Sequence, residues 1–446
     1  MSTLNVDKVD PNTGTALEIG SSGDTITVPT GAGLTVVDEV KTNKISPATG
    51  TAFALGDSGD TFTVPSGATI VNSGTATGFG ISSSSFLPNA QPIIINGDMA
   101  VAQRSTSATG KTVSGYYSVD RVRNEFNVGT YTFAQESLTS GPAYEAGFRN
   151  AFRLDTTTAE TPTAPDYVTM GYYFEGSQLS SFKFGGPNAT KITLAFWVKS
   201  NKTGTGNVVM RNPDSSLRQA SHSYTISVAD TWEHKILVFD GDTSAGFNDD
   251  NNQSMQLYWW LDGGSNFQVG SVSDGAWGAQ NNSCFYAGAD LDIAQNTAND
   301  WAFTGVQMLA GEYSASTLPP FQFDSYGDNL KRCQRYYYKL KNDSGGASTC
   351  FWGNSMIDSS TTLKGVIRYP EMREKPSSFE TTGTATDYII WSSGNTSTTC
   401  SAVPTFESHT SFAGRLLFTV SSGLTAGQAG AYRAASTDAY LAWSAE

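Results

Sequence analysis

The chain of 446 residues has little cysteine and little charge. Its four cysteines are Cys284, Cys333, Cys350 and Cys400, and no two of them have the C-x-x-C spacing of a zinc ribbon or a redox motif. Charged residues make up 15% of the chain, against roughly 25% in typical soluble domains. The scattered cysteines are therefore interpreted as small buried apolar residues. Only Cys333 and Cys350 are close enough in sequence to test for a disulfide.

Further absences bear on location and partners. The first ten residues contain neither a basic nor an apolar stretch, so no secretory signal is recognised. The longest apolar runs, such as residues 93–95, are far too short to cross a bilayer. The net charge of −14 would repel a polyanion. These features predict a protein made in a cytoplasm, with no membrane insertion and no nucleic-acid partner.

A repeat is the clearest feature that the sequence does contain. Residues 11–32 and 47–68 are one segment written twice, with identical residues at 15 of 22 aligned positions. A fixed period of this kind predicts a repeated supersecondary unit. Each unit has too few apolar residues to offset a chain entropy of roughly 1–2 kcal/mol per residue, and two stacked units are fewer than the about three usually needed. We therefore expect residues 1–75 to form the stem of a homo-oligomer, most simply a homotrimer.

The rest of the chain predicts an all-β protein. Apolar and polar residues alternate in 192–199 and 233–239, as in strands with one buried face. Ten or more such strands between residues 93 and 323 predict a β-sandwich of the jelly-roll type. The predicted segments are a stem (1–75), a Gly/Ser/Thr linker (76–92), the jelly roll (93–323), a bridging helix (324–340), a linker (341–348) and a C-terminal β-sandwich (349–446).

The predicted helix is short and amphipathic. Leu330, Cys333, Tyr337 and Leu340 fall on one stripe at helical spacing. Asp324 or Ser325, one or the other, is expected to cap its first turn.

Residues 236–330 contain no Lys and no Arg but twelve acids, together with several aromatic residues. Aromatic faces stack on the C–H faces of sugar rings, and carboxylates and amides accept hydroxyl protons. The stretch is thus suited to a neutral glycan and poorly suited to phosphate, which prefers Arg and Lys. The candidate carbohydrate-binding residues are Tyr258, Trp259, Trp260, Trp277 and Tyr286.

The alternative is that these aromatic residues are core or oligomer contacts. In residues 257–261, strand alternation buries either Tyr258 and Trp260 or Trp259 with its apolar neighbours. One tryptophan of the pair is therefore expected to face outward, and the sequence leaves open which one.

A second candidate site is acidic. Asp240, Asp242, Asp249 and Asp250 lie in one Gly/Asn-rich segment and could hold Ca²⁺ together with backbone carbonyls. The spacing is not that of an EF-hand loop, and a solvated acidic loop is the alternative. No other cofactor is expected.

Catalytic motifs are missing. The sequence has no nucleophile elbow, no H-E-x-x-H and no P-loop, so the chain is not expected to be an enzyme. A pair of carboxylates for glycoside cleavage remains an alternative, because the acidic stretch offers many pairs.

Two segments together resemble a known module. Residues 95–104 (Ile-Asn-Gly-Asp-Met-Ala-Val-Ala-Gln-Arg), followed by Tyr-Tyr-Ser-Val-Asp-Arg at 116–121, resemble the opening of a β-sandwich module of bacteriophage tail fibres and related virion proteins. Residues 319–338, where a proline-aromatic run leads to Cys-Gln-Arg-Tyr-Tyr-Tyr, resemble its closing segment. Residues 366–376 and the end of the chain resemble the C-terminal sandwich that often follows.

The first six residues and the repeat resemble leaders of marine phage structural proteins. The resemblance implies a virion fibre that attaches the particle to the host cell surface, with glycan recognition by the distal sandwiches. It implies three kinds of partner: further copies of the chain, a virion protein at the stem, and a host glycan or other receptor. The alternatives are a structural virion component, such as a capsid decoration fibre or connector, and a polysaccharide depolymerase.

Overall fold

The computed structural model describes residue 9 and residues 91–214, 217–342, 350–393 and 396–446. Apart from residue 9, the stem predicted for residues 1–75 lies outside these residues, as do nearly all of the linker 76–92 and most of the linker 341–348. The homotrimer was predicted from the stem and therefore stays a prediction. Within the described stretches, no helix is both long and apolar enough to cross a membrane.

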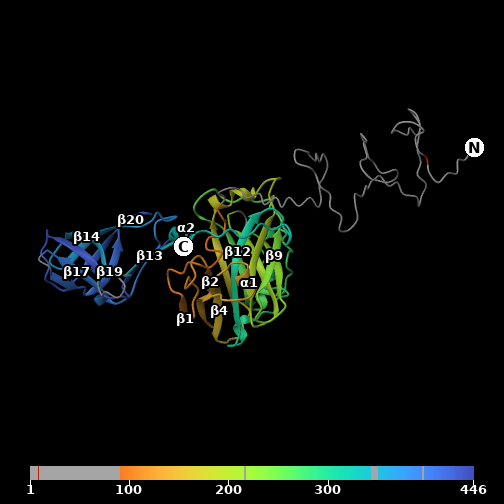
Figure 1. Cartoon of the computed structure of the whole chain (residues 1–446), viewed down its shortest axis with the longest axis horizontal. Helices are drawn as coiled ribbons and strands as arrows, with labels where there is room; N and C mark the ends of the chain where they lie inside the picture. Colours follow the sequence, from red (N-terminus) through yellow and green to blue (C-terminus); the bar gives the residue numbers. More distant parts are fainter. Residues whose placement is uncertain (1–8, 10–90, 215–216, 343–349, 394–395) are drawn as a thin grey trace, which may run out of the picture. The chain divides into compact units, whose positions relative to one another are not determined.

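The N-terminal sandwich, residues 91–323, consists of two six-stranded antiparallel sheets (Figure 1). The first has the order β1 (Ser107–Lys111), β3 (Thr130–Ser137), β4 (Asn150–Thr158), β12 (Asp300–Ala310), β6 (Ile192–Lys199), β9 (Glu233–Phe239). The second has the order β11 (Gly278–Ala279), β8 (Arg218–Ile226), β7 (Gly204–Asn212), β10 (Gln253–Gly263), β5 (Tyr167–Glu175), β2 (Arg123–Phe126).

From β4 to β12 the chain passes repeatedly from one sheet to the other, as in a jelly roll. The predicted all-β class and β-sandwich are thereby confirmed for the described residues. Short helical turns connect the strands: α1 (Pro142–Glu145), η1 (Gly176–Gln178), η2 (Ser180–Phe182), η3 (Ser265–Phe267), η4 (Asn282–Cys284) and η5 (Ile293–Gln295).

The predicted bridging helix is shorter than expected. Helix α2 spans Tyr326–Gln334, and the Ser325 hydroxyl caps it by accepting from the Asp328 backbone N–H at 3.2 Å. Tyr337–Lys341 is instead strand β13, which pairs with β22 (Tyr440–Ser444). The prediction of a helix over 324–340 was wrong in its second half, because aromatic residues favour strands and a distant strand offers them a ladder.

The C-terminal sandwich, residues 337–446, packs a three-stranded sheet on a seven-stranded one. The first has the order β13, β22, β16 (Ser378–Thr381). The second has the order β18 (Thr396–Thr399), β17 (Tyr388–Ser392), β21 (Ala429–Ala434), β14 (Cys350–Ile357), β15 (Thr362–Arg368), β20 (Ala413–Thr419), β19 (Ala402–Glu407), with η6 (Ala385–Asp387) before β17. Side chains of both sheets share one core. This sandwich begins with β13, earlier than the predicted residue 349.

The two segments that carry the resemblance to phage fibres lie together. Asn329 of α2 donates from Nδ2 to Oδ1 of Asn96 at 3.3 Å and of Asp98 at 3.1 Å. Gln103 donates to the Tyr337 carbonyl at 2.7 Å. These polar contacts tie the opening of the sandwich to its closing segment, so the residues of this motif have a structural role.

All four cysteines are free. Cys333 is buried with Ile95, Val101 and Tyr336 in a small apolar cluster, so the disulfide considered between Cys333 and Cys350 is not formed. Burial raises the pKa of the Cys333 thiol well above its usual range, as expected for an inert packed cysteine.

Candidate carbohydrate-binding groove

The two faces of β10 separate the predicted aromatic residues. Leu257, Trp259 and Leu261 point into the core between the sheets. The ring of Trp259 is fully buried, 5.4 Å from Phe196 and 5.0 Å from Phe303 between centroids. Trp259 is therefore a core residue, and its prediction as a glycan contact was wrong.

Trp260 lies on the outer face of the same sheet, in a second aromatic cluster. Its ring centroid lies 4.8 Å from Phe267, 5.1 Å from Phe285 and 5.9 Å from Tyr167. Phe267 and Phe285 belong to the segment between β10 and β12, which folds back over this face. Only 6% of Trp260 is exposed, so the ring forms the floor of the cluster.

Tyr258 and Tyr286 belong to this cluster but differ in exposure to the groove. Tyr258 contributes to the floor, and its hydroxyl lies 3.0 Å from that of Tyr173. Tyr286 is fully buried, and its hydroxyl donates to the Leu261 carbonyl at 3.2 Å. Tyr286 therefore anchors the covering segment, and its prediction as a contact was wrong.

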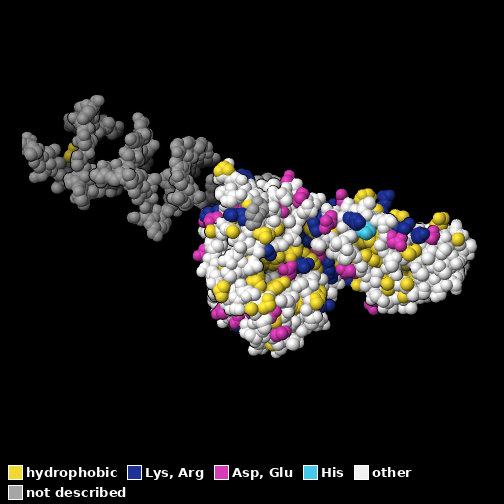
Figure 2. Space-filling model, turned by 180° about the vertical axis from the view of Figure 1, so that it is seen from behind, with side chains coloured by type: hydrophobic (Ala, Val, Ile, Leu, Met, Phe, Trp, Pro, Cys, Tyr) yellow, Lys and Arg dark blue, Asp and Glu magenta, His cyan; other side chains and the backbone are white. Residues whose placement is uncertain are grey.

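A cavity of about 230 Å³ opens at this cluster and is called the outer-face groove. It is lined by Glu125, Tyr167, Thr169, Arg211, Tyr258, Trp260, Phe267, Asn282 and Phe285. Figure 2 shows a face of the N-terminal sandwich on which apolar side chains lie next to acidic and basic ones. Apolar pockets with a few convergent polar groups are the usual form of a small-molecule site.

The polar groups stand at opposite sides of the aromatic floor. Glu125 accepts hydrogen bonds from Arg123 Nε at 2.7 Å and from the Tyr173 hydroxyl. Arg211 donates from Nη2 to Gln280 Oε1 at 2.8 Å, and its guanidinium lies 5.8 Å from the centre of the Phe285 ring. Both groups are fixed by neighbours, so an acceptor and a donor are held ready around the rings.

Burial raises the pKa of the Tyr258 hydroxyl above its ordinary value. The hydroxyl is therefore neutral at physiological pH and can both donate and accept.

Trp277 lies outside the groove. Its ring packs edge-on against Phe184, with the centroids 5.2 Å apart, and its indole N–H donates to the Asp240 carbonyl at 2.8 Å. It stabilises a loop, and the structure does not bring it to the other candidates.

The four predicted calcium ligands do not share one site. Asp242 is buried and accepts from Arg218 Nε at 2.5 Å, while Asp250 accepts from the backbone and side chain of Asn252. Asp240 and Asp249 are exposed. Among the described residues no group of three or more His, Cys, Asp or Glu side chains is placed to hold a metal ion. The carboxylate of Asp242 is instead neutralised by a guanidinium, which corrects the prediction.

The acidic stretch, residues 236–330, contributes aromatic side chains to the groove but no carboxylates. None of its twelve acids lines the groove, whereas four of its aromatic residues and Asn282 do: Tyr258, Trp260, Phe267 and Phe285. The charged groups of the groove, Glu125 and Arg211, come from β2 and β7, and Tyr167 comes from β5. The sequence contained no local signal for them, because only strand pairing places these three beside Trp260.

Comparisons with known proteins place the chain in no family. No protein-family model and no curated protein matches it. Among solved structures it is similar to a carbohydrate-binding module reported under "CBM4 structure and function" (10% identity, 49% of this chain, 99% of that chain, TM-score 0.25). It is also similar to a family 11 carbohydrate-binding module from Clostridium thermocellum in complex with a mixed-linked tetrasaccharide (10%, 47% and 98%, TM-score 0.23).

A third similar structure is the enzymatically active domain of tailspike protein 4 of bacteriophage CBA120, at 14% identity and a TM-score of 0.24. The match covers 49% of this chain and only 21% of that one. TM-scores of this size assign neither a family nor a function.

Proposed function

We propose that the protein binds a glycan through the outer-face groove of its N-terminal sandwich. The observation that carries this proposal is the placement of an aromatic floor, formed by Trp260, Tyr258 and Tyr167, between the fixed polar groups Glu125 and Arg211. The negative faces of aromatic rings attract polarised C–H groups, and hydroxyl groups at the edge of a sugar ring can donate to Glu125 and accept from Arg211.

The setting that we propose for this activity is a bacteriophage fibre. The support is the N-terminal repeat, which calls for further copies of the chain, and the resemblance of residues 95–121 and 319–338 to phage fibre modules. In this proposal the stem docks to a virion protein, three chains form one fibre, and the sandwiches contact the host surface without catalysis.

A purely structural virion role is the second candidate. The observation that favours it is the low exposure of Trp260 and Tyr258, which suits packing as well as binding.

The decisive experiment applies the full chain to a panel of immobilised bacterial polysaccharides. Tyr167 lines the groove and is only partly buried, so Tyr167→Ala removes a ring of the groove at a smaller cost to the fold than the loss of a fully buried ring. The expected result is selective binding by the wild type, its loss in Tyr167→Ala, and full retention in Trp277→Ala, whose ring lies elsewhere. Absence of binding to any polysaccharide and to host cells, with retained binding to particles that lack the protein, would favour the structural role.

A further inference from the structure

A second cavity lies beside the outer-face groove, where the N-terminal sandwich, the end of α2 and the C-terminal sandwich meet. This junction pocket has a volume of about 180 Å³, room for about six water molecules at roughly 30 Å³ each. It is lined by Tyr116, Arg121, Arg123, Tyr173, Phe174, Glu175, Gln253, Tyr336, Arg373 and Glu446.

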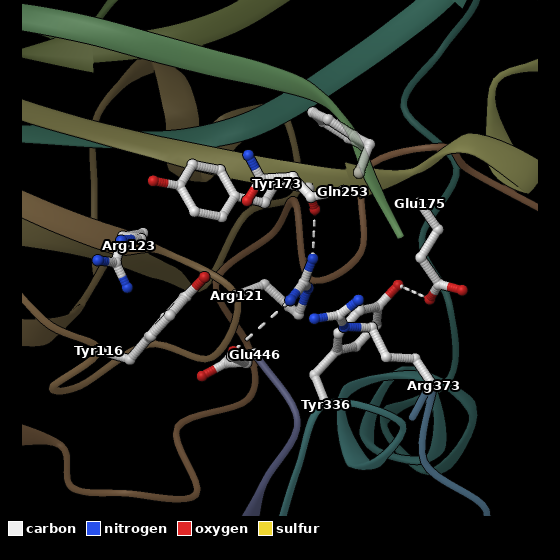
Figure 3. Close-up of a pocket in the computed structure, with 10 residues that line it drawn as sticks. Tyr116, Arg121, Arg123, Tyr173, Glu175, Gln253, Tyr336, Arg373 and Glu446 are labelled. Atoms are coloured by element: carbon white, nitrogen blue, oxygen red, sulfur yellow. Dashed lines mark hydrogen bonds and ion pairs between the residues drawn. The ribbon is translucent and has the colours of Figure 1, made fainter. Parts of the chain in front are cut away.

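The pocket contains a buried guanidinium with unused hydrogen-bonding capacity. Arg121 is 4% exposed, and it lies over the Tyr336 ring at 3.4 Å from the centroid. Its Nη2 donates to the Tyr173 carbonyl at 2.5 Å, and its Nη1 is 3.6 Å from Glu446 Oε1. Its Nε is buried without a hydrogen-bond partner among the described residues. Figure 3 shows Arg121 projecting between Glu446 and Tyr336.

Two neighbouring groups are also unsatisfied. Glu446 Oε1 and the Tyr116 hydroxyl are buried and have no hydrogen-bond partner in the described part of the chain. Buried polar atoms are normally paired, so each unpaired one needs an explanation. Burial raises the pKa of Tyr116, and its hydroxyl therefore stays neutral and able to donate.

Arg123 adds a second guanidinium that is partly open to solvent. Its Nε is bound to Glu125, and its guanidinium lies 5.4 Å from the ring centres of both Tyr116 and Tyr173. Its two Nη groups have no hydrogen bond to another described residue. Arg373 and Glu175 also line the pocket, but both are bonded to other residues. The groups left for a ligand are therefore the free N–H groups of two guanidiniums and one carboxylate oxygen of Glu446.

The junction pocket and the outer-face groove are parts of one surface. Arg123 of the pocket is bonded to Glu125 of the groove, and Tyr173 of the pocket to Tyr258 of the groove. A chain of sugars lying on the aromatic floor would therefore reach the guanidinium groups with its next units.

We propose that the junction pocket binds a carboxylate-bearing sugar unit, a hexuronate, so that the glycan recognised by this face is acidic. Guanidinium groups bind carboxylates with strong charge-assisted hydrogen bonds, and a ring hydroxyl of the same sugar donates to Glu446 Oε1. A plain anion has no hydroxyl to donate to that oxygen and would be repelled by its charge. This inference deepens the proposed function and rests on it for the assignment of this sheet face to sugars.

The test uses the full-length protein and glucuronate as the probe, with glucose and acetate as matched controls that lack the carboxylate or the ring hydroxyls. Calorimetry or ligand-observed NMR is expected to show binding of glucuronate, with glucose and acetate weaker by about tenfold or more. Arg123→Gln is expected to weaken glucuronate binding by a similar factor. Arg149→Gln, an equal charge change at an exposed arginine that lines neither cavity, should leave it unchanged.

Several results would overturn the inference. Equal binding of glucose would remove the role of the carboxylate, and unchanged binding in a folded Arg123→Gln variant would remove the role of the pocket. Sulfate binding as tight as glucuronate binding would contradict the role of Glu446.

The tests of the pocket and of the groove can fail separately. Loss of polysaccharide binding in Tyr167→Ala without any binding of glucuronate would leave the proposed function intact and refute the acidic sugar. The opposite result is binding of glucuronate that depends on Arg123, in a protein that binds no polysaccharide through Tyr167. It would support the acidic-sugar pocket and refute glycan binding by the groove.

Discussion

Trp259 and Trp260 are neighbours in β10 but lie in two different regions of the molecule. The first is enclosed between the sheets, and the second lies on the outer face under a covering segment. The inner face is closed on all sides by apolar side chains, whereas the outer face leaves a cavity with charged groups at its edge. Two similar residues therefore serve different purposes, because strand alternation sends them to opposite faces. The inner face stabilises the fold, and the outer face is the one that we propose for a ligand.

The largest expected effect is on the inner face. Trp259→Ala should lower the free energy of unfolding by about 3–5 kcal/mol, because it leaves a cavity in a closely packed core. Chemical denaturation measures this loss. Trp259→Phe is the control: it keeps most of the volume and removes an indole N–H that has no partner in the described structure, so it should cost clearly less. A cost for Trp259→Ala below that of Trp260→Ala would reverse the assignment of the two faces.

The next effect separates binding from stability. Trp260→Ala should cost about 1.5–3 kcal/mol of stability, and it should weaken glycan binding by about tenfold or more, equivalent to ~1.4 kcal/mol. Binding is measured at a temperature where denaturation curves show the variant to be folded. Unchanged affinity in the folded variant would mean that the outer aromatic cluster only packs.

The smallest effect is electrostatic and concerns Asp262, which follows a bulge near the end of β10 and pairs with Val168. Burial, with a contribution from the charge of Asp292, raises the pKa of Asp262 to about 6. The folded state therefore holds this proton more tightly than the unfolded state, in which an aspartate has a pKa of about 3.9. Stability from this group is highest below about pH 4 and falls as the pH rises to about 6.

Asp262→Asn removes this titration while keeping a side-chain acceptor for the backbone N–H of Ala294, now 3.1 Å from the Asp262 carboxylate. The difference in unfolding free energy, variant minus wild type, should rise between about pH 4 and pH 6 and level off above that range. Parallel pH profiles of the two proteins would show that Asp262 titrates normally.

Much of the fold could be predicted because it follows from local patterns. Residues 192–199 and 233–239 alternate with period two, and they form β6 and β9 with those bounds. The start of α2 was predicted from its cap, and Ser325 provides it. The end of α2 was not, because Tyr337–Lys341 is fixed as a strand by pairing with Tyr440–Ser444, about a hundred residues further along the chain.

The candidate site was only partly predictable for the same reason. Alternation showed that Trp259 and Trp260 face opposite ways, but the choice between them depends on which face the second sheet covers. Arg123, Glu125 and Arg211 carry no motif, and they reach the aromatic residues only through the order of β2, β5, β10 and β7 in the sheet. Long-range pairing is therefore the information that the sequence pattern lacks.

The central claim is that the outer face binds a glycan while the inner face only supports it. Its most direct test is the equilibrium affinity of the full chain for the polysaccharide that it binds best, measured by calorimetry for the wild type, Tyr167→Ala and Trp277→Ala. The account predicts an affinity loss of about tenfold or more for Tyr167→Ala and none for Trp277→Ala. Equal affinities in all three proteins would contradict it.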